Sequence, residues 1–255
     1  MHRLLADGAL LGSESPSLPR EAERHLKVLR VKEGEKVELF DGAGRTRLYA
    51  VAKSGGLVAA GPVVAHPRMA DSITLFACVT KGSRWDWTIE KATELGVSRI
   101  VPVISERTIV RLRDDEKAAK AERWRRVAED AARQSDAVWL PEVAEPVSFA
   151  ESLALVRKCD ACFVGALAEP PPKPMLAAVE ESFRAGGAHG GFAAYVGPEG
   201  DFTPEELASL LEIATPVSLG PTVLRAETAA IYACTVLAAA LEARGAVNGN
   251  VSKTT

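Results

Sequence analysis

The pattern of apolar and polar residues changes near residue 72 of this chain. Beyond that point, short apolar runs alternate with longer stretches of mixed composition. Strands alternating with helices predict an α/β fold, in which a parallel sheet is covered by helices on both faces. The predicted strands are 73–79, 99–105, 161–167, 192–197 and 216–220.

Several predicted helices have clear end signals. Ser148 with Glu151, and Thr203 with Glu206, have the spacing of capping boxes, which mark helix N-termini. Gly96 follows "KATEL" where a C-terminal cap is expected. The predicted helices are 85–95, 114–134, 149–157, 175–183, 204–212 and a last one that ends near 244.

The first part of the chain has another pattern. A short helix is expected at 19–30, followed by strands at 36–40, 47–52 and 57–65 that are separated by glycine-rich turns. We therefore predict a small β-barrel-like domain over 1–70, an α/β domain over 71–246 and a disordered tail over 247–255.

Composition adds limits to this picture. The chain has 255 residues, of which 47% are hydrophobic and 25% charged, as in ordinary globular proteins. No stretch approaches the ~18 consecutive apolar residues of a membrane span, so we expect a cytoplasmic protein without a membrane partner. Residues 1–70 carry eleven Lys and Arg against eight Asp and Glu, which suits binding of a polyanion but also a solvated surface.

The cysteines include one CxxC, formed by Cys159 and Cys162. A zinc site would need a second such pair or histidines, and a redox site would need the motif at a helix start. This motif instead runs into the apolar segment "ACFVGAL", so we interpret it as structural and expect no metal.

Three loops follow the carboxyl ends of predicted strands, where open parallel sheets bind ligands. They read "ALAEPPPKP", "GPEGDF" and "LGPTVLRAE", and none has the glycine spacing of a dinucleotide or P-loop site. The last loop enters a helix that we expect to carry Arg225 and Glu227 in its first turn. A cation is unfavourable there, and such violations of local rules concentrate at functional sites.

Five segments together resemble one family. "VGPEGDF", "LGPTVLRAETAA", "KATELGV" with "VPVISER", "RHLKVLRVKEGEKVELFDGAG" and "RWRRVAEDAARQSDAVWLPEV" are similar to segments of the 16S ribosomal RNA uracil-N3 methyltransferases of the SPOUT class. The resemblance implies a PUA-like RNA-binding barrel, then an α/β domain with a C-terminal deep trefoil knot. It also implies S-adenosylmethionine as cofactor, small-subunit rRNA or the ribosomal subunit as partner, and a homodimer.

The resemblance also suggests site residues. Arg225 would stabilise charge on the uracil, and Glu227 would act as a base or orient Arg225, although it could also be an ordinary first-turn carboxylate. Glu90 and Glu94 lie one helical turn apart beside Lys91, and we favour a plain helix face for Glu90 while keeping Glu94 as a substrate-site or structural residue. The expected cofactor pocket consists of Leu167, Gly197, Pro198, Glu199, Gly200, Leu219, Gly220 and Leu224. The expected RNA contacts are Arg24, Lys27, Arg30, Lys81 and Arg84, with solvated surface charges as the alternative.

Four positions depart from the family's usual pattern. Asp201 replaces a common glycine, Thr222 a basic residue, Ala226 a threonine and Ala137 an arginine. These departures bear on the RNA substrate more than on the cofactor. Two alternatives stay open: a SPOUT methyltransferase of another RNA or atom, such as a ribose 2′-hydroxyl, and a non-catalytic RNA-binding assembly factor.

Overall fold

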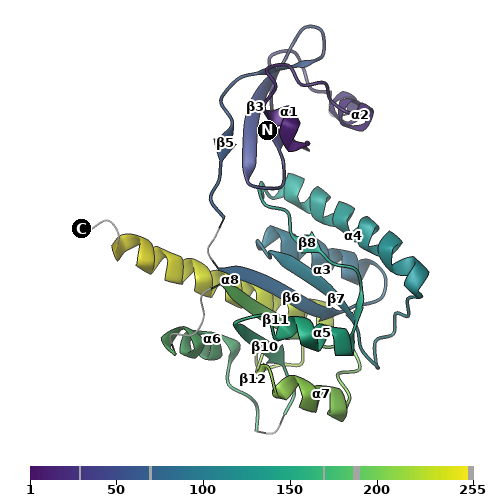
Figure 1. Cartoon of the computed structure of the whole chain (residues 1–255), viewed down its shortest axis with the longest axis vertical. Coiled ribbons are helices and arrows are strands. Elements are labelled where there is room, and N and C mark those ends of the chain that lie inside the picture. The colour runs from purple at the N-terminus through teal and green to yellow at the C-terminus, as the bar shows by residue number, and fades with distance from the viewer. Residues whose placement is uncertain (29, 69–70, 169, 186–189, 252–255) are drawn as a thin grey trace. The chain divides into compact units, whose positions relative to one another are not determined.

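The backbone of the chain pairs into two separate sheets, each in its own compact unit (Figure 1). The computed structural model describes residues 1–28, 30–68, 71–168, 170–185 and 190–251, apart from the side chains of residue 21 and residues 246–251. Unit 1 comprises Met1–Arg68 and Glu129–Leu140, and unit 2 comprises Met69–Ala128 and Pro141–Thr255.

Unit 2 contains a parallel sheet of seven strands in the order β12-β10-β11-β6-β7-β8, with β9 also paired to β7. The predicted parallel sheet is thus confirmed. The strands are β6 (Ser72–Cys78), β7 (Arg99–Ile104), β8 (Glu142–Val143), β9 (Val147–Ser148), β10 (Ala161–Gly165), β11 (Gly191–Val196) and β12 (Thr215–Val217). The short strands β8 and β9 were not predicted, because two-residue strands leave no apolar run to detect.

Helices cover both faces of this sheet. Alternate residues of one strand enter different cores: Leu75 and Ala77 face the helices α3, α4, α6 and α8, whereas Phe76 and Cys78 face α5 and α7. The helices are α3 (Ser83–Glu94), α4 (Asp114–Gln134), α5 (Phe149–Val156), α6 (Met175–Arg184), α7 (Pro204–Leu211) and α8 (Ala226–Val251). The predicted helices all form.

The predicted end signals also form. Ser148 and Thr203 accept hydrogen bonds from the backbone of Glu151 and Glu206, and both capping boxes are complete. Gly96 adopts a φ of +73° directly after α3, a conformation that glycine reaches without strain. These local devices place the helix ends, and hence the loops between them, at fixed points around the sheet.

The last helix differs from its prediction. α8 continues to Val251, past the expected end near Arg244, so residues 247–251 of the predicted disordered tail are helical. Extending an existing helix adds one hydrogen bond per residue without a new nucleation cost, which offsets the poor propensity of "VNGN". Residues 252–255 lie outside the described residues.

Part of α8 is unusually apolar. Within the described residues, Ala226–Gly245 is the one segment whose length and composition would suffice to cross a membrane. Here it is a core helix, with Ala230, Cys234, Leu237 and Leu241 packed against the sheet. Burial in the protein accounts for the apolar character of this inward face, which makes up 44% of the segment.

Unit 1 has a five-stranded sheet in the order β1-β2-β3-β4, with β5 paired to β3. The elements are β1 (His2–Leu5), α1 (Gly8–Leu11), α2 (Arg20–Val28), β2 (Lys36–Phe40), β3 (Arg45–Val51), β4 (Leu57–Ala59) and β5 (Val64–Ala65). The strand predicted at 57–65 is two strands, because the chain breaks at "GP". β1 and α1 were not predicted.

Buried Arg3 connects the two chain segments of unit 1. Its guanidinium donates to the carbonyl oxygens of Ala132 at 2.8 Å and Ala137 at 3.2 Å, and pairs with Glu38 at 2.7 Å. The Gly44 N–H also donates to the Val138 carbonyl. Residues 129–140 therefore complete unit 1 although they are distant from it in sequence.

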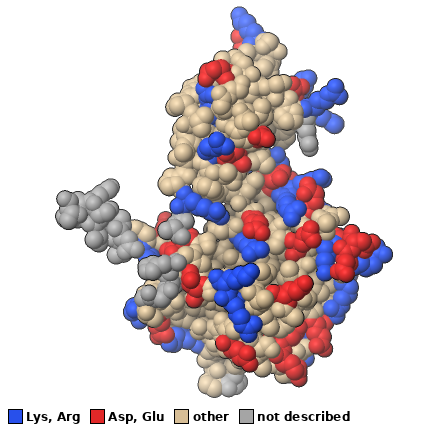
Figure 2. All heavy atoms as spheres, viewed as in Figure 1, with Lys and Arg blue, Asp and Glu red and all other residues tan. Residues whose placement is uncertain are grey.

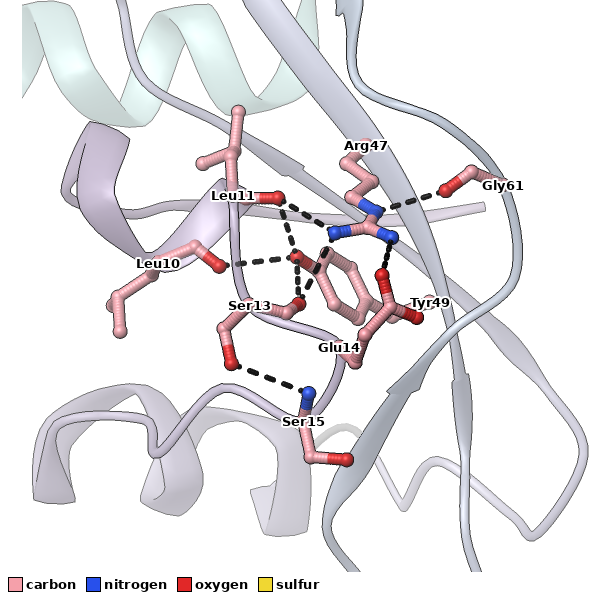
Figure 3. Close-up of polar contacts among 8 residues, drawn as sticks. All are labelled: Leu10, Leu11, Ser13, Glu14, Ser15, Arg47, Tyr49 and Gly61. Atoms are coloured by element: carbon pink, nitrogen blue, oxygen red, sulfur yellow. Dashed lines mark hydrogen bonds and ion pairs between the residues drawn. The ribbon is translucent and has the colours of Figure 1, made fainter.

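A second buried arginine holds the N-terminal segment onto β3 (Figure 3). The Arg47 guanidinium donates to the carbonyl oxygens of Gly61 at 2.8 Å, Leu11 at 3.0 Å and Ser13 at 3.2 Å, and pairs with Glu14 at 2.5 Å. The position after α1 suits a cation, because the helix C-terminus is negative.

We expect Arg47→Met to lower the Tm of the protein several times more than Arg45→Met does. The Arg47 side chain is 9% exposed, and its loss leaves the Gly61 carbonyl without its side-chain donor and the Leu11 and Ser13 carbonyls with the shared Tyr49 hydroxyl alone. Arg45 is 50% exposed, and its ion pair in the described structure is with Asp41. Thermal denaturation followed by circular dichroism measures both. Equal Tm losses would show that the Arg47 cluster does not anchor the segment.

Candidate functional site

Three neighbouring strands end at one edge of the unit 2 sheet and supply the walls of a cavity. β12, β10 and β11 are adjacent and parallel, so the loops after Gly165, Val196 and Val217 emerge together. The cavity has a volume of about 490 Å³. This is the edge at which open parallel sheets bind ligands, so the position predicted from the three loop sequences fits the observed cavity.

Seven predicted pocket residues line this cavity. They are Leu167, Gly197, Pro198, Glu199, Leu219, Gly220 and Leu224. Among the described residues, Gly200 is not part of the wall, since its carbonyl points to Arg107 behind the loop. Three of the departures from the family pattern, Asp201, Thr222 and Ala226, line the cavity as well.

Two glycines let the walls approach each other. A Cβ atom on Gly165 would lie 2.7 Å from Leu219, and one on Gly197 would lie 2.9 Å from Phe202. Both distances are shorter than carbon atoms tolerate, so a larger residue at either position would have to displace the side chain of Leu219 or Phe202. The loop after β10 is also joined to the end of β12, because Ser218 donates to the Lys173 carbonyl at 2.9 Å.

The loop Gly197–Thr203 is held from behind by the loop that follows β7. Arg107 donates through Nη1 to the Gly200 carbonyl at 3.1 Å and to the Phe202 carbonyl at 3.2 Å. Buried Glu206 accepts the N–H of Glu106 at 2.9 Å through Oε1 and that of Thr203 at 3.1 Å through Oε2. Sequence reasoning found the capping role of Glu206 but missed this bridge, because its partner is distant in sequence.

Asp201 takes an uncommon backbone conformation in the same loop. Its φ is +58°, a left-handed value that glycine adopts freely and that Asp tolerates better than most residues. Its N–H donates to the Pro198 carbonyl at 3.0 Å, and its Oδ1 accepts the Phe202 N–H at 2.7 Å. The left-handed conformation explains why glycine suits this position. An aspartate there must adopt the same backbone conformation, and its side chain hydrogen-bonds to the next N–H.

Arg225 and Glu227 lie at the start of α8 but in different settings. The prediction that Arg225 is in the first turn is wrong by one position: it directly precedes the helix, and its carbonyl accepts the first helical bond, from Ala229 at 2.8 Å. Arg225 is exposed, and it lines the cavity from its position before the first turn of α8.

Glu227 is in the first turn and is 9% exposed. Its Oε2 has no hydrogen-bond partner among the described residues, and Glu227 is not part of the described cavity wall. An unpaired buried carboxylate oxygen is costly, so this group calls for a functional or a solvent partner.

The charges around the cavity are balanced in part. Arg84, at the start of α3, forms an ion pair with Glu199 in the loop after β11, and both residues line the cavity. This pair joins the first turn of α3, which follows β6, to the loop after the neighbouring strand β11. Asp201 and Arg225 add one charge of each sign to the wall.

The other predicted contact residues occupy different places. Arg24, Lys27 and Arg30 are exposed in unit 1, and Lys81 is exposed just before α3 in unit 2. Lys91 pairs with Glu90 at 2.7 Å and with Glu94 at 2.8 Å, and these two hydrogen bonds raise the pKa of Lys91. Glu90 and Glu94 thus share one cation on the surface of α3, an arrangement that fits the interpretation of Glu90 as part of a charged helix face.

The cysteines are free thiols. Cys162 is buried in β10, as expected for a structural residue, and burial raises its pKa. Burial likewise raises the pKa of Cys78 to about 11 and that of Cys234 to about 12, so these thiols are protonated and unreactive at neutral pH. Among the residues that the structure describes, no group of three or more His, Cys, Asp or Glu side chains could hold a metal ion.

Comparisons with known families match both units. A family model described as an RNA methyltransferase domain matches residues 67–238. A second model, described as an RNA methyltransferase PUA domain, matches residues 18–57. The first match covers more than half of the chain and contains every residue of the cavity wall.

Named relatives support the same assignment. Ribosomal RNA small subunit methyltransferase E of Synechocystis is 30% identical over 85% of this chain and 70% of its own length. The Bacillus subtilis protein of that name is 33% identical over 62% of this chain, and the match spans 61% of its length, less than two thirds. The crystal structure of the Neisseria gonorrhoeae protein of that name, bound to S-adenosylmethionine, has a TM-score of 0.73 and 29% identity, covering 97% of this chain and 98% of that one.

Proposed function

Because the chain belongs to the ribosomal RNA small subunit methyltransferase E family, we propose that it transfers a methyl group from S-adenosylmethionine to N3 of a uridine in 16S rRNA. The observation that carries the proposal is the cavity at the carboxyl edge of the sheet, lined by the three loops whose sequences resemble that family. The loops, the cavity and the family all lead to one reaction class.

The cavity suits the cofactor in size and chemistry. A volume of about 490 Å³ lies within the usual range for small-molecule sites. The walls combine apolar side chains such as Leu167 and Leu219 with backbone groups of Gly197 and Gly220, which fits adenine better than a phosphate. S-adenosylmethionine bound there would supply an electrophilic methyl group, and these loop residues would hold its adenosine moiety.

We extend the proposal to the path of the chain. β12 lies at the edge of the sheet, yet the next element, α8, packs against β11 and β6 in its middle. The connecting residues share the cavity wall with the loop after β11. This return supports a C-terminal segment threaded as a deep trefoil knot, which would fix the cofactor loops firmly.

Arg225 is proposed as the residue that stabilises the reacting base. Uracil N3 carries a proton, and its loss leaves negative charge on O2 and O4. A cation already oriented at the cavity wall stabilises that charge without reorganisation. Glu227, whose buried Oε2 lacks a partner, is proposed to orient Arg225 or to accept the N3 proton.

The RNA contacts are proposed on exposed cations. Lys and Arg side chains gather over α2 in Figure 2; Arg24 and Lys27 are exposed on this helix, as is Arg20, and Arg30 is exposed just after it. Lys81 and Arg84 are proposed to contact phosphates near the cavity. Glu94, which pairs with Lys91 within α3, is proposed as a substrate-site or structural residue. N3 lies on the pairing edge of uracil, so the target base must be unpaired.

The remaining expectations are proposals too. We propose that residues 1–70 act as the RNA-binding domain and 71–246 as the methyltransferase domain, with residues 129–140 completing the first. The working unit is proposed to be a homodimer in the cytoplasm, and the exposed aromatic side chains of Trp87 and Tyr232 are available for such contacts.

The test of the function is mass spectrometry of nucleosides from small-subunit rRNA incubated with the protein and S-adenosylmethionine. We expect N3-methyluridine to accumulate. A methylated ribose or another base would establish the alternative of a different target atom. Cofactor binding without any methylated nucleoside, on both free rRNA and intact subunits, would contradict the proposed reaction.

Arg225→Ala should reduce the single-turnover rate roughly 10²-fold while leaving the Kd for S-adenosylmethionine nearly unchanged, because it removes charge stabilisation in the transition state. Arg184→Ala, which removes an exposed arginine whose ion pair in the described structure is with Glu180, serves as the matched control. An unchanged rate in the Arg225 variant would refute its catalytic role.

The triple change of Arg24, Lys27 and Arg30 to Ala should weaken RNA binding and lower the slope of log K against log salt by roughly 2 to 3. Changing Lys32, Lys36 and Lys53 to Ala removes the same charge from other exposed positions of unit 1 and should alter the slope less. Fluorescence anisotropy with an rRNA fragment measures both slopes. Equal slopes for the two variants would show that α2 does not form the interface.

A further inference from the structure

Asp201 contributes a carboxylate to the cavity wall at a backbone position that disfavours a side chain. Its φ of +58° is a conformation in which a glycine would be free of strain. The aspartate keeps this turn at some cost, and strained residues of this kind cluster at ligand sites. The position of Asp201 in the cavity wall therefore suggests a role for its carboxylate in ligand binding.

The Asp201 carboxylate makes one hydrogen bond within the loop and can accept others. Oδ1 accepts the Phe202 N–H at 2.7 Å, which closes the turn. No cation pairs with Asp201 among the residues that the structure describes, whereas the neighbouring Glu199 is paired with Arg84. Asp201 is thus the carboxylate of the described wall whose charge no ion pair offsets.

The proposed methyl donor and its product differ by one positive charge. S-adenosylmethionine has a sulfonium, and the demethylated S-adenosylhomocysteine has a neutral thioether at the same place. Asp201 lines this cavity of about 490 Å³, so a cofactor bound in it would place its sulfonium in the same cavity as the Asp201 residue. A Coulomb interaction between two opposite charges on the order of 10 Å apart, in a partly desolvated cavity, changes affinity several-fold.

We propose that Asp201 is a specificity-determining residue that makes the cavity favour the cationic methyl donor over the neutral product. This inference rests on the proposed function. Before transfer, the sulfonium is attracted to the carboxylate of Asp201. After transfer the sulfur is neutral and the attraction is lost, so the product is released more readily and inhibits less.

A purely structural role for Asp201 predicts something different. If the side chain only closes the turn through Phe202, then Asp201→Asn retains that hydrogen bond, because an amide oxygen can accept it as well. The charge is the single property that this variant removes. Asp201→Gly removes the side chain and also relieves the backbone, so it tests the charge in a second and less strained background.

The experiment is calorimetric titration of the full-length protein with S-adenosylmethionine and, separately, with S-adenosylhomocysteine. We expect Asp201→Asn and Asp201→Gly to raise the Kd for the methyl donor roughly 3- to 10-fold and to leave the Kd for the product within about twofold. The difference should shrink as salt is added. Asp160→Asn is the matched control, because Asp160 also accepts a backbone N–H, from Gly191, but at the opposite edge of the same sheet.

The outcomes are distinguishable. Equal changes in both Kd values, or no change in either, would overturn the role of Asp201 while leaving the cofactor assignment intact. A wild-type protein that binds neither compound would overturn the proposed function and this inference with it. A selective loss of affinity for the cation in both variants, absent from Asp160→Asn, supports the proposal.

Discussion

The parallel pairing of β11 between β10 and β6 is the interaction on which the candidate site depends. In this register Tyr195 lies beside Val164 on one side and Phe76 on the other, so the carboxyl ends of the three strands are level. The loops that follow them must then emerge at one edge. Pairing β12 to the far side of β10 adds the segment that leads into α8. No single loop forms the cavity. A change in the register of one strand would move its loop away from the other two.

Backbone pairing sets the place of the loops, but hydrogen bonds from outside the cavity set their shape. Arg107 and Glu206 lie behind the loop that carries Glu199 and Asp201, and they satisfy its backbone groups. A loop held in this way has little conformational freedom left to lose when a ligand binds, which favours affinity. The wall that faces the ligand is left free to vary, and the departure at Asp201 is such a variation.

The sequence was informative where a local rule decides the structure. Capping boxes at Ser148 and Thr203, and apolar runs of strand length, predicted nearly every helix and the parallel sheet of unit 2. Contacts between distant residues could not be predicted from the sequence: the hydrogen bond from the Glu106 N–H to Glu206 has no local sequence signal. The exact start of α8, which places Arg225 just before the helix rather than within it, had no local signal either. The predicted strand ends indicated which three loops would form the cavity wall, and family likeness indicated which of their residues would line it.

The return of residues 129–140 to unit 1 has a consequence for how such a protein can be divided. A fragment that ends at residue 68 contains Arg3 and Gly44 but lacks the carbonyls of Ala132, Ala137 and Val138 that these residues contact. Ala132 lies in the last turn of α4, whose earlier turns belong to the other unit, and Ala137 and Val138 lie just after this helix. Neither unit therefore corresponds to one continuous segment of the gene. Recombination that transferred a single segment would leave either unit incomplete, so the two units must be inherited together.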